Sequence, residues 1–115
     1  MEMWFNPGCS KCRVAKELLD EAGVAYTVRR YLDEPPTADE LDEVLARLGL
    51  EPWDIARTSE PVAREIGLAD LPHDRRRWIE AMVEHPILIQ RPIIVADDGS
   101  AVVGRSEESV RRVLP

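Results

Sequence analysis

The residues of this chain best suited to chemistry are its two cysteines. Cys9 and Cys12 are the only cysteines present, and they stand three positions apart in the segment N-P-G-C-S-K-C-R. A pair with this spacing can form a structural disulfide, contribute to a metal site or act as a redox-active thiol pair. The other ligands that the chain offers, and the elements around the pair, decide between these uses.

A metal site at the cysteines would lack further ligands. Zinc takes four ligands, and beyond the two thiols only His73 and His85 remain, with no second C-x-x-C and no H-x-x-x-H spacing. We therefore expect no metal and no bound cofactor. A purely structural pair of buried thiols remains an alternative, which a position at the start of a helix disfavours.

The segments around the cysteines predict a strand that leads into a helix. Residues 2–5 have the pattern of a short buried strand, and a turn follows over residues 6–8. A helical pattern of apolar residues comes next and ends at Gly23. At a helix N-terminus, unpaired amides and the helix dipole stabilise a thiolate. We therefore expect Cys9 to have a lowered pKa and to be the nucleophile, with Cys12 close enough to attack a Cys9 adduct.

The rest of the chain combines strand and helix patterns, with the helices gathered in the middle. A second strand is predicted over residues 24–31, and the strand-helix-strand order implies that the two strands are parallel. Thr37 and Glu40 form a capping box ahead of the next helix, which Gly49 ends. Further elements are predicted as helices around 61–66 and 74–84, a hairpin over 93–96 and 101–103, and a last helix from Ser106.

This element order predicts an α/β fold of the thioredoxin-like, or glutaredoxin-like, type. A βαβ half and a ββα half would share one four-stranded mixed sheet, with a helical insertion of about residues 37–85 between them. The length of 115 residues and the hydrophobic content of 44% suit one core. We therefore expect a single domain over residues 1–115.

The composition excludes some classes of function. The formal net charge of -7 argues against a general nucleic-acid binder, because phosphate neutralisation needs a basic surface. No stretch approaches the roughly 20 apolar residues of a membrane span, and the first residues lack a signal-peptide pattern, so we expect a cytoplasmic protein. The positive charges are thirteen arginines and only two lysines. An acidic protein can still gather a few guanidinium groups at one oxyanion site.

Motifs along the whole chain resemble one family. They are N-P-G-C-S-K-C-R at the first helix, L-D-E-P-P-T before the second, I-A-R-T-S-E-P and E-I-G-L in the middle, and H-P-I-L-I-Q-R-P-I-I-V and G-R-S-E-E-S-V-R-R-V-L-P toward the end. In these motifs the sequence resembles the arsenate reductase family of the thioredoxin-fold ArsC type. The same superfamily contains Spx-type regulators, which bind RNA polymerase.

The resemblance implies a site for arsenate. In the family one cysteine attacks arsenate, and three arginines hold the oxyanion and its developing charge. The matching positions are Cys9 in N-P-G-C, Arg57 in I-A-R-T, Arg91 in Q-R-P-I and Arg105 in V-G-R-S. We also assign Ser10 and Lys11, which follow the nucleophile, to substrate binding. Pro92 resembles the cis-proline that faces the cysteine in thioredoxin-like folds.

The chain departs from the family pattern at two positions. Family members carry a histidine four residues before the cysteine, thought to help lower its pKa, and Phe5 stands there in this chain. Activation of Cys9 would then rely on the helix N-terminus with Arg57 or Arg13. Glutaredoxin-coupled members have a serine at the place of Cys12 and rely on glutathione. Regeneration here would use glutathione or another thiol, or an internal disulfide that thioredoxin reduces.

The function that we predict is an arsenate reductase that acts as a monomer, with glutaredoxin or thioredoxin as its partner. Two alternatives stay open. One is an Spx-like redox-sensing regulator that binds RNA polymerase, although Spx-type proteins lack the third arginine, which is Arg105 here. The other is a general thiol-disulfide oxidoreductase, for which the arginines would be dispensable.

Overall fold

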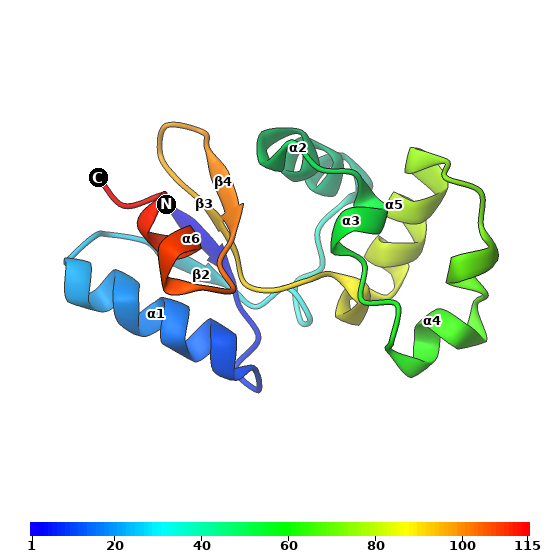
Figure 1. Cartoon of the computed structure of the whole chain (residues 1–115), viewed down its shortest axis with the longest axis horizontal. Coiled ribbons are helices and arrows are strands. Elements are labelled where there is room, and N and C mark those ends of the chain that lie inside the picture. Colours follow the sequence, from blue (N-terminus) through cyan, green and yellow to red (C-terminus); the bar gives the residue numbers. More distant parts are fainter. The chain divides into compact units, whose positions relative to one another are not determined.

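Four short strands form one mixed sheet in the computed structural model, which describes residues 1–115 (Figure 1). The strands are β1 (Glu2–Trp4), β2 (Thr27–Arg29), β3 (Ile93–Val95) and β4 (Ala101–Val103). Their order across the sheet is β2-β1-β3-β4. β1 runs parallel to β2 and antiparallel to β3, and β3 and β4 form an antiparallel hairpin. The predicted four-stranded mixed sheet is confirmed.

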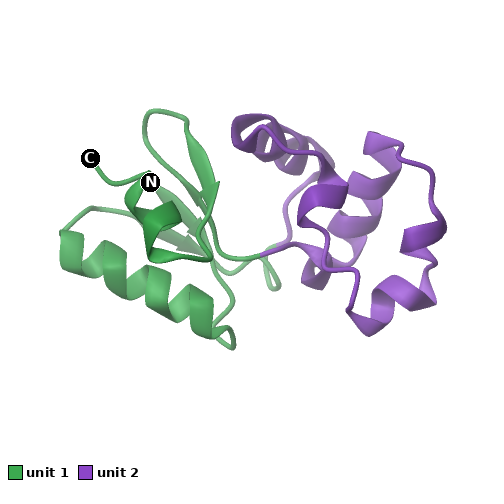
Figure 2. Cartoon of the chain, viewed as in Figure 1, with its two compact units in different colours: residues 1–34, 91–115 green, residues 35–90 purple.

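The chain divides by its internal contacts into two units, which Figure 2 colours separately. Unit 1 comprises residues 1–34 and 91–115 and contains the sheet, whereas unit 2 comprises residues 35–90. Every helix between β2 and β3 belongs to unit 2, so the predicted order of a βαβ half, a helical segment and a ββα half is correct. A single domain with an insertion over 37–85 stays a prediction.

Two helices pack on one face of the sheet in unit 1. Helix α1 (Ser10–Ala22) begins directly after Cys9 and ends at Gly23, whose φ of 70° lies in the left-handed region that glycine adopts without strain. Helix α6 (Glu107–Arg111) follows Ser106, which caps it. The two helices share a buried core with β1 and β3, formed by Met3, Ala15, Leu19, Ile94, Ala96, Val110 and Val113. This core holds α1, which begins directly after Cys9, against the sheet.

Strand β2 is shorter than the predicted strand over 24–31. Its pairing with β1 runs only from Thr27, opposite Glu2, to Arg29, opposite Trp4. The Phe5 N–H adds one more hydrogen bond to the Arg29 carbonyl at 2.8 Å, and the turn that contains Pro7 then ends β1. A strand needs a partner along its length, so β2 stops where β1 stops.

Unit 2 consists of helices and short turns. Its elements are α2 (Ala38–Leu48), α3 (Pro52–Ile55), α4 (Pro61–Glu65), α5 (Arg75–Glu84) and the 3-10 turns η1 (Leu68–Asp70) and η2 (Pro86–Leu88). The predicted capping box is present: the Glu40 N–H donates to Thr37 Oγ1 at 3.1 Å, and the Thr37 N–H donates to Glu40 Oε1 at 3.0 Å. Helix α3 was not predicted, because a single turn is too short to show helical periodicity.

An arginine of α5 ties three segments of unit 2 together. Arg75 Nε lies 2.7 Å from Asp42 Oδ1 of α2, and its Nη1 lies 3.0 Å from Glu51 Oε2, just before α3. Apolar side chains of these helices, among them Leu41, Leu45, Ile79 and Met82, fill the interior of the unit. No helix of the structure is both long enough and apolar enough to cross a membrane.

Candidate active site

The turn that carries the cysteines lies where the ends of three strands meet. Trp4 of β1 pairs with Arg29 of β2 and with Ile93 of β3. Because β1 and β2 are parallel and β3 is antiparallel to them, the segments after β1 and β2 and the segment before β3 share one edge of the sheet. These segments contain the N-P-G-C turn, Tyr31 and Arg91, respectively.

Cys9 is the first of the two thiols and occupies the N-cap position of α1. Its N–H donates to the Asn6 carbonyl at 3.0 Å, and its carbonyl accepts from the Arg13 N–H at 3.2 Å, which fixes the turn and the first helical residue. The residue is 7% exposed, whereas Cys12 is 0% exposed. Both cysteines are free thiols.

The pKa of Cys9 is lowered to about 7. Burial opposes ionisation, but the backbone amide of Cys12, the side chain of Arg91 and, to a smaller extent, the Cys12 thiol and the Lys11 amide stabilise the thiolate. The amides belong to the first turn of α1, as expected for a thiol at a helix N-terminus. Near neutral pH a large share of Cys9 is therefore a thiolate, which is the reactive form.

Cys12 has the opposite acid-base behaviour. Burial raises its pKa to about 12, and the negative charge on Cys9 contributes in the same direction. The backbone N–H of Asn6 acts against both. Its side chain is 0% exposed. Cys12 therefore remains a protonated thiol at neutral pH and helps to stabilise the Cys9 thiolate.

Two of the three predicted arginines belong to the same unit as the cysteines. The Arg91 side chain stabilises the Cys9 thiolate, and Arg105 Nη1 donates to the Arg91 carbonyl at 3.0 Å. The Arg91-Pro92 peptide bond is cis, which agrees with the resemblance of Pro92 to the cis-proline of thioredoxin-like folds. The arginine that acts on Cys9 was expected to be Arg57 or Arg13, whereas the structure assigns this effect to Arg91.

The other two arginines have different partners. Arg13 Nη1 donates to the Pro7 carbonyl at 3.1 Å. Arg57 lies in unit 2, where its N–H donates to the Leu88 carbonyl at 2.7 Å and its Nη1 lies 2.5 Å from Glu60 Oε1. The Arg57 side chain is 21% exposed. Its guanidinium group is thus held by a carboxylate within its own unit.

The remaining predicted substrate residues, Ser10 and Lys11, are exposed at the start of α1. Lys11 and Arg105 line a small pocket of about 90 Å³ between the starts of α1 and α6, together with the exposed apolar side chain of Val14. No cluster of three or more histidine, cysteine, aspartate or glutamate side chains that could hold a metal ion is present. His73 stacks on the Trp53 ring within unit 2, with ring centroids 4.2 Å apart.

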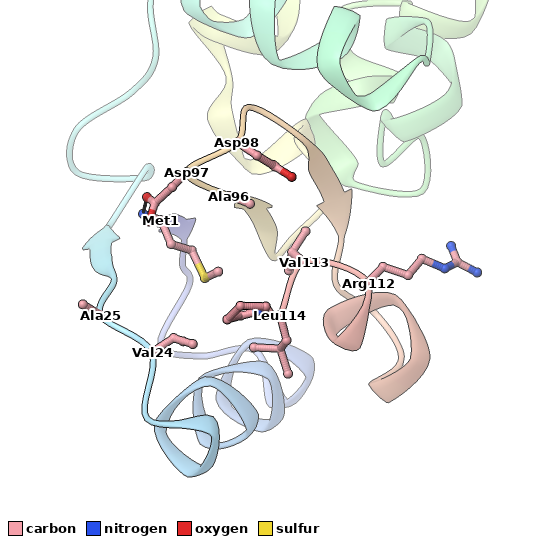
Figure 3. Close-up of a pocket in the computed structure, with 10 residues that line it drawn as sticks. Met1, Val24, Ala25, Ala96, Asp97, Asp98, Arg112, Val113 and Leu114 are labelled. Atoms are coloured by element: carbon pink, nitrogen blue, oxygen red, sulfur yellow. Dashed lines mark hydrogen bonds and ion pairs between the residues drawn. The ribbon is translucent and has the colours of Figure 1, made fainter.

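A second cavity in unit 1, of about 440 Å³, lies near both chain termini and is shown in Figure 3. Its wall is formed by apolar side chains such as Val113 and Leu114, and Asp97 and Asp98 lie at its border. None of the predicted site residues lines this cavity. It is therefore separate from the cysteine site.

Tyr31 is a residue of this site to which the sequence analysis assigned no role. It was expected at the end of the second strand, and it instead lies two residues beyond β2, at 1% exposure. The positive charge of Arg91 acts on its hydroxyl, and so does the negative charge of either cysteine when that cysteine is ionised. The signal that could have identified it is topological, because residues just beyond two neighbouring parallel strands lie at the same edge of the sheet.

The model of the ArsC family matches residues 4–113. The chain belongs to the ArsC family. The ArsC resemblance predicted from the motifs is thus confirmed, and so is the thioredoxin-like fold, since ArsC-type structures share it.

Some relatives of this chain are named arsenate reductases, and one similar relative is named only as uncharacterized. An uncharacterized protein in the glnII region of Streptomyces viridochromogenes is 60% identical over 117 residues, which cover 99% of this chain and 98% of that protein. An arsenate reductase of Neisseria meningitidis serogroup A is 38% identical over 115 residues, which cover 99% and 97% of the two chains. The solved structure of an arsenate reductase from Vibrio cholerae superimposes with a TM-score of 0.92 at 38% identity, over 99% and 98% of the chains.

Proposed function

We propose that this ArsC-family chain is an arsenate reductase whose nucleophile is Cys9. One observation carries the proposal: Cys9, at the start of α1 and beside Arg91, has a pKa of about 7. Membership in a family that includes named arsenate reductases supplies the substrate. A thiolate next to a guanidinium group and free helix amides suits attack on an oxyanion, because the positive charges offset the repulsion between the two anions.

In the first step the Cys9 thiolate attacks arsenic(V). A sulfur-arsenic bond forms, one arsenic-oxygen bond breaks, and the oxygen leaves as water after it takes up protons. Arg57, Arg91 and Arg105 hold the remaining oxygens and neutralise their charge. Ser10 and Lys11, exposed beside the nucleophile, assist in binding the substrate.

In the second step another thiol attacks the Cys9 sulfur. A disulfide forms, the sulfur-arsenic bond breaks, and its electron pair remains on arsenic, which becomes arsenic(III). The attacking thiol is Cys12 or an external thiol such as glutathione. Cys12 is favoured by its place in the first turn of α1 and its effect on the Cys9 sulfur. Once Cys9 is bonded to arsenic, the thiolate charge that helps to raise the pKa of Cys12 is lost, which makes Cys12 easier to ionise.

The activity is tested by oxidation of NADPH in the presence of arsenate. One assay contains thioredoxin and its reductase, and the other contains glutaredoxin, glutathione and glutathione reductase. We expect turnover in at least one assay and its complete loss in Cys9→Ser. Absence of turnover in both, with a Cys9-Cys12 disulfide still forming under peroxide, would replace the reductase by a redox switch or a thiol-disulfide oxidoreductase.

The variant Cys12→Ser identifies the reductant. If Cys12 attacks the arsenic adduct, this variant loses turnover with thioredoxin and keeps turnover with glutaredoxin and glutathione, because an external thiol can take the place of Cys12. An equal loss in both assays would show that Cys12 has no resolving role. Retention of both would show that an external thiol completes the reaction in the unmodified protein.

A further inference from the structure

The Tyr31 hydroxyl is a buried polar group that the proposed reaction does not yet use. The side chain is 1% exposed, and no hydrogen bond of ordinary geometry reaches its oxygen. A buried hydroxyl without a partner lowers the stability of a protein, so natural structures contain few of them. A phenylalanine would fill nearly the same space without this cost, which suggests that the hydroxyl has a use in another state of the protein.

The groups around Tyr31 connect it to the resolving thiol rather than to solvent. The backbone N–H of Asn6 acts on the Cys12 sulfur. The Asn6 side chain lies close enough to the Tyr31 hydroxyl to affect the acidity of that hydroxyl. Burial raises the pKa of Tyr31 to about 12, against the opposing charge of Arg91, so the group stays a protonated donor at neutral pH. Both Asn6 and Tyr31 follow parallel strands at the same edge of the sheet.

Cys12 needs a hydrogen-bond donor when it reacts. Its side chain is 0% exposed, so water cannot stabilise the thiolate that must form before Cys12 attacks another sulfur. The backbone N–H of Asn6 is one donor to this sulfur. The Tyr31 hydroxyl is a second donor in the same buried group; it lies near the Asn6 side chain and makes no hydrogen bond of ordinary geometry.

We propose that Tyr31 is a positioning residue for the second half of the reaction, in which its hydroxyl donates a hydrogen bond to the Cys12 sulfur as that thiol ionises and attacks Cys9. The inference rests on the part of the proposed function that makes Cys12 the resolving thiol. It assigns Tyr31 no part in the first step, and the groups that lower the pKa of Cys9 are others.

The second half of the reaction can be observed without arsenate by using oxidised glutathione. The Cys9 thiolate attacks this disulfide, forms a mixed disulfide and releases one glutathione thiolate. Cys12 then loses its proton and attacks the Cys9 sulfur, the Cys9-Cys12 disulfide forms, and the second glutathione leaves and takes up that proton. Samples quenched in acid at successive times and weighed by mass spectrometry separate the reduced, mixed-disulfide and internal-disulfide forms.

The decisive comparison is Tyr31→Phe against Tyr26→Phe. Tyr26 is the other tyrosine of the chain, and its hydroxyl donates to Asp20 at the surface of unit 1. In Tyr31→Phe we expect the mixed disulfide to accumulate and the internal disulfide to form about ten-fold more slowly, as for the loss of a hydrogen bond to a charged group. The rate of the first step should not change, and Tyr26→Phe should behave as the unmodified protein.

Two further measurements separate this role from packing and from the proposed function. The unfolding temperature of Tyr31→Phe should be equal to that of the unmodified protein or higher, because the variant removes an unpartnered polar group. Formation of the internal disulfide at the normal rate in Tyr31→Phe would overturn the inference. Slow formation of this disulfide accompanied by a lower unfolding temperature would overturn it as well. Failure of the unmodified protein to form the internal disulfide would also overturn it, while arsenate turnover with glutathione would leave the reductase proposal intact.

Discussion

At the scale of single residues, two identical thiols three positions apart have opposite acid-base properties. Cys9 stands at the N-terminus of α1, where amides and Arg91 outweigh burial, and its pKa falls to about 7. Cys12 lies one turn inside the helix without exposure, and its pKa rises to about 12. In the proposed reaction this difference lets the Cys9 sulfur attack first, while Cys12 keeps its proton until Cys9 has reacted.

The lowered pKa of Cys9 predicts the pH at which this residue becomes reactive. A thiol with a lowered pKa is protonated below that value and ionised above it, so the rate of alkylation by iodoacetamide should rise with pH through about 7 and then level off. An unperturbed thiol would show the same rise near about 8.5. Intact mass should show one alkylated site, because Cys12 is buried and protonated.

The contribution of Arg91 can be measured in the same experiment. Arg91→Gln removes a group that stabilises the thiolate, so the midpoint of the alkylation profile should move to higher pH. Arg13→Gln is the matched control, since the Arg13 side chain donates to the Pro7 carbonyl and should not affect the midpoint. Equal midpoints in both variants would show that the helix amides alone lower the pKa of Cys9.

At the scale of elements, the β3-β4 hairpin positions the segment that carries Arg91. The Gly104 N–H, just after β4, donates to the Pro92 carbonyl at 2.8 Å, and Arg105 Nη1 donates to the Arg91 carbonyl at 3.0 Å. The close contact between the ends of the two strands leaves little room for a side chain at position 104. A Cβ there would lie 3.0 Å from Ile94 Cδ1, 3.2 Å from Val110 Cγ2 and 3.3 Å from Pro92 Cγ.

Gly104→Ala should therefore destabilise the protein. Crowding of this kind in a packed core costs about 1 to 3 kcal/mol, which urea unfolding would report as a lower free energy of unfolding. Gly8→Ala is the control, because its Cβ would meet only Asn6 Oδ1, at 3.4 Å. Ile94→Val removes the nearest atom, so the loss in the double variant should be smaller than the sum of the two single losses. Full additivity would contradict the steric explanation.

At the scale of the whole molecule, the residues assigned to the reaction are distributed over both units. Cys9, Cys12, Arg91 and Arg105 belong to unit 1, whereas Arg57 belongs to unit 2 and is paired with Glu60 there. The groups that lower the pKa of Cys9 belong to unit 1. For Arg57 the proposed role is to hold the substrate.

Arg57→Ala tests this division of roles. We expect kcat/KM for arsenate to fall about 10- to 100-fold, the usual effect of losing a charge-assisted hydrogen bond, while the alkylation midpoint of Cys9 stays where it is. Arg64→Ala, at an exposed position of α4 in the same unit, should leave both quantities unchanged. A shift of the Cys9 midpoint in Arg57→Ala, or unchanged arsenate kinetics, would contradict the assigned role.

Much of the fold could be predicted because its determinants are local. Gly23 and Gly49 end their helices, Thr37 and Glu40 form the capping box, and the strands of the hairpin lie where expected. The two failures have different causes. α3 is a single turn that shows no periodicity, and β2 is shorter than its β-forming sequence because the partner strand β1 ends at Trp4.

The sequence by itself determined that Cys9 begins a helix, since a strand, a turn and a helical pattern follow one another within a few residues. Only the tertiary structure decided which arginine acts on Cys9 and that Tyr31 lies in the same buried group as Cys12. Arg91 and Tyr31 are far from the cysteines along the chain. They reach the same edge of the sheet through the strand order β2-β1-β3, which depends on long-range pairing and not on the spacing of nearby residues.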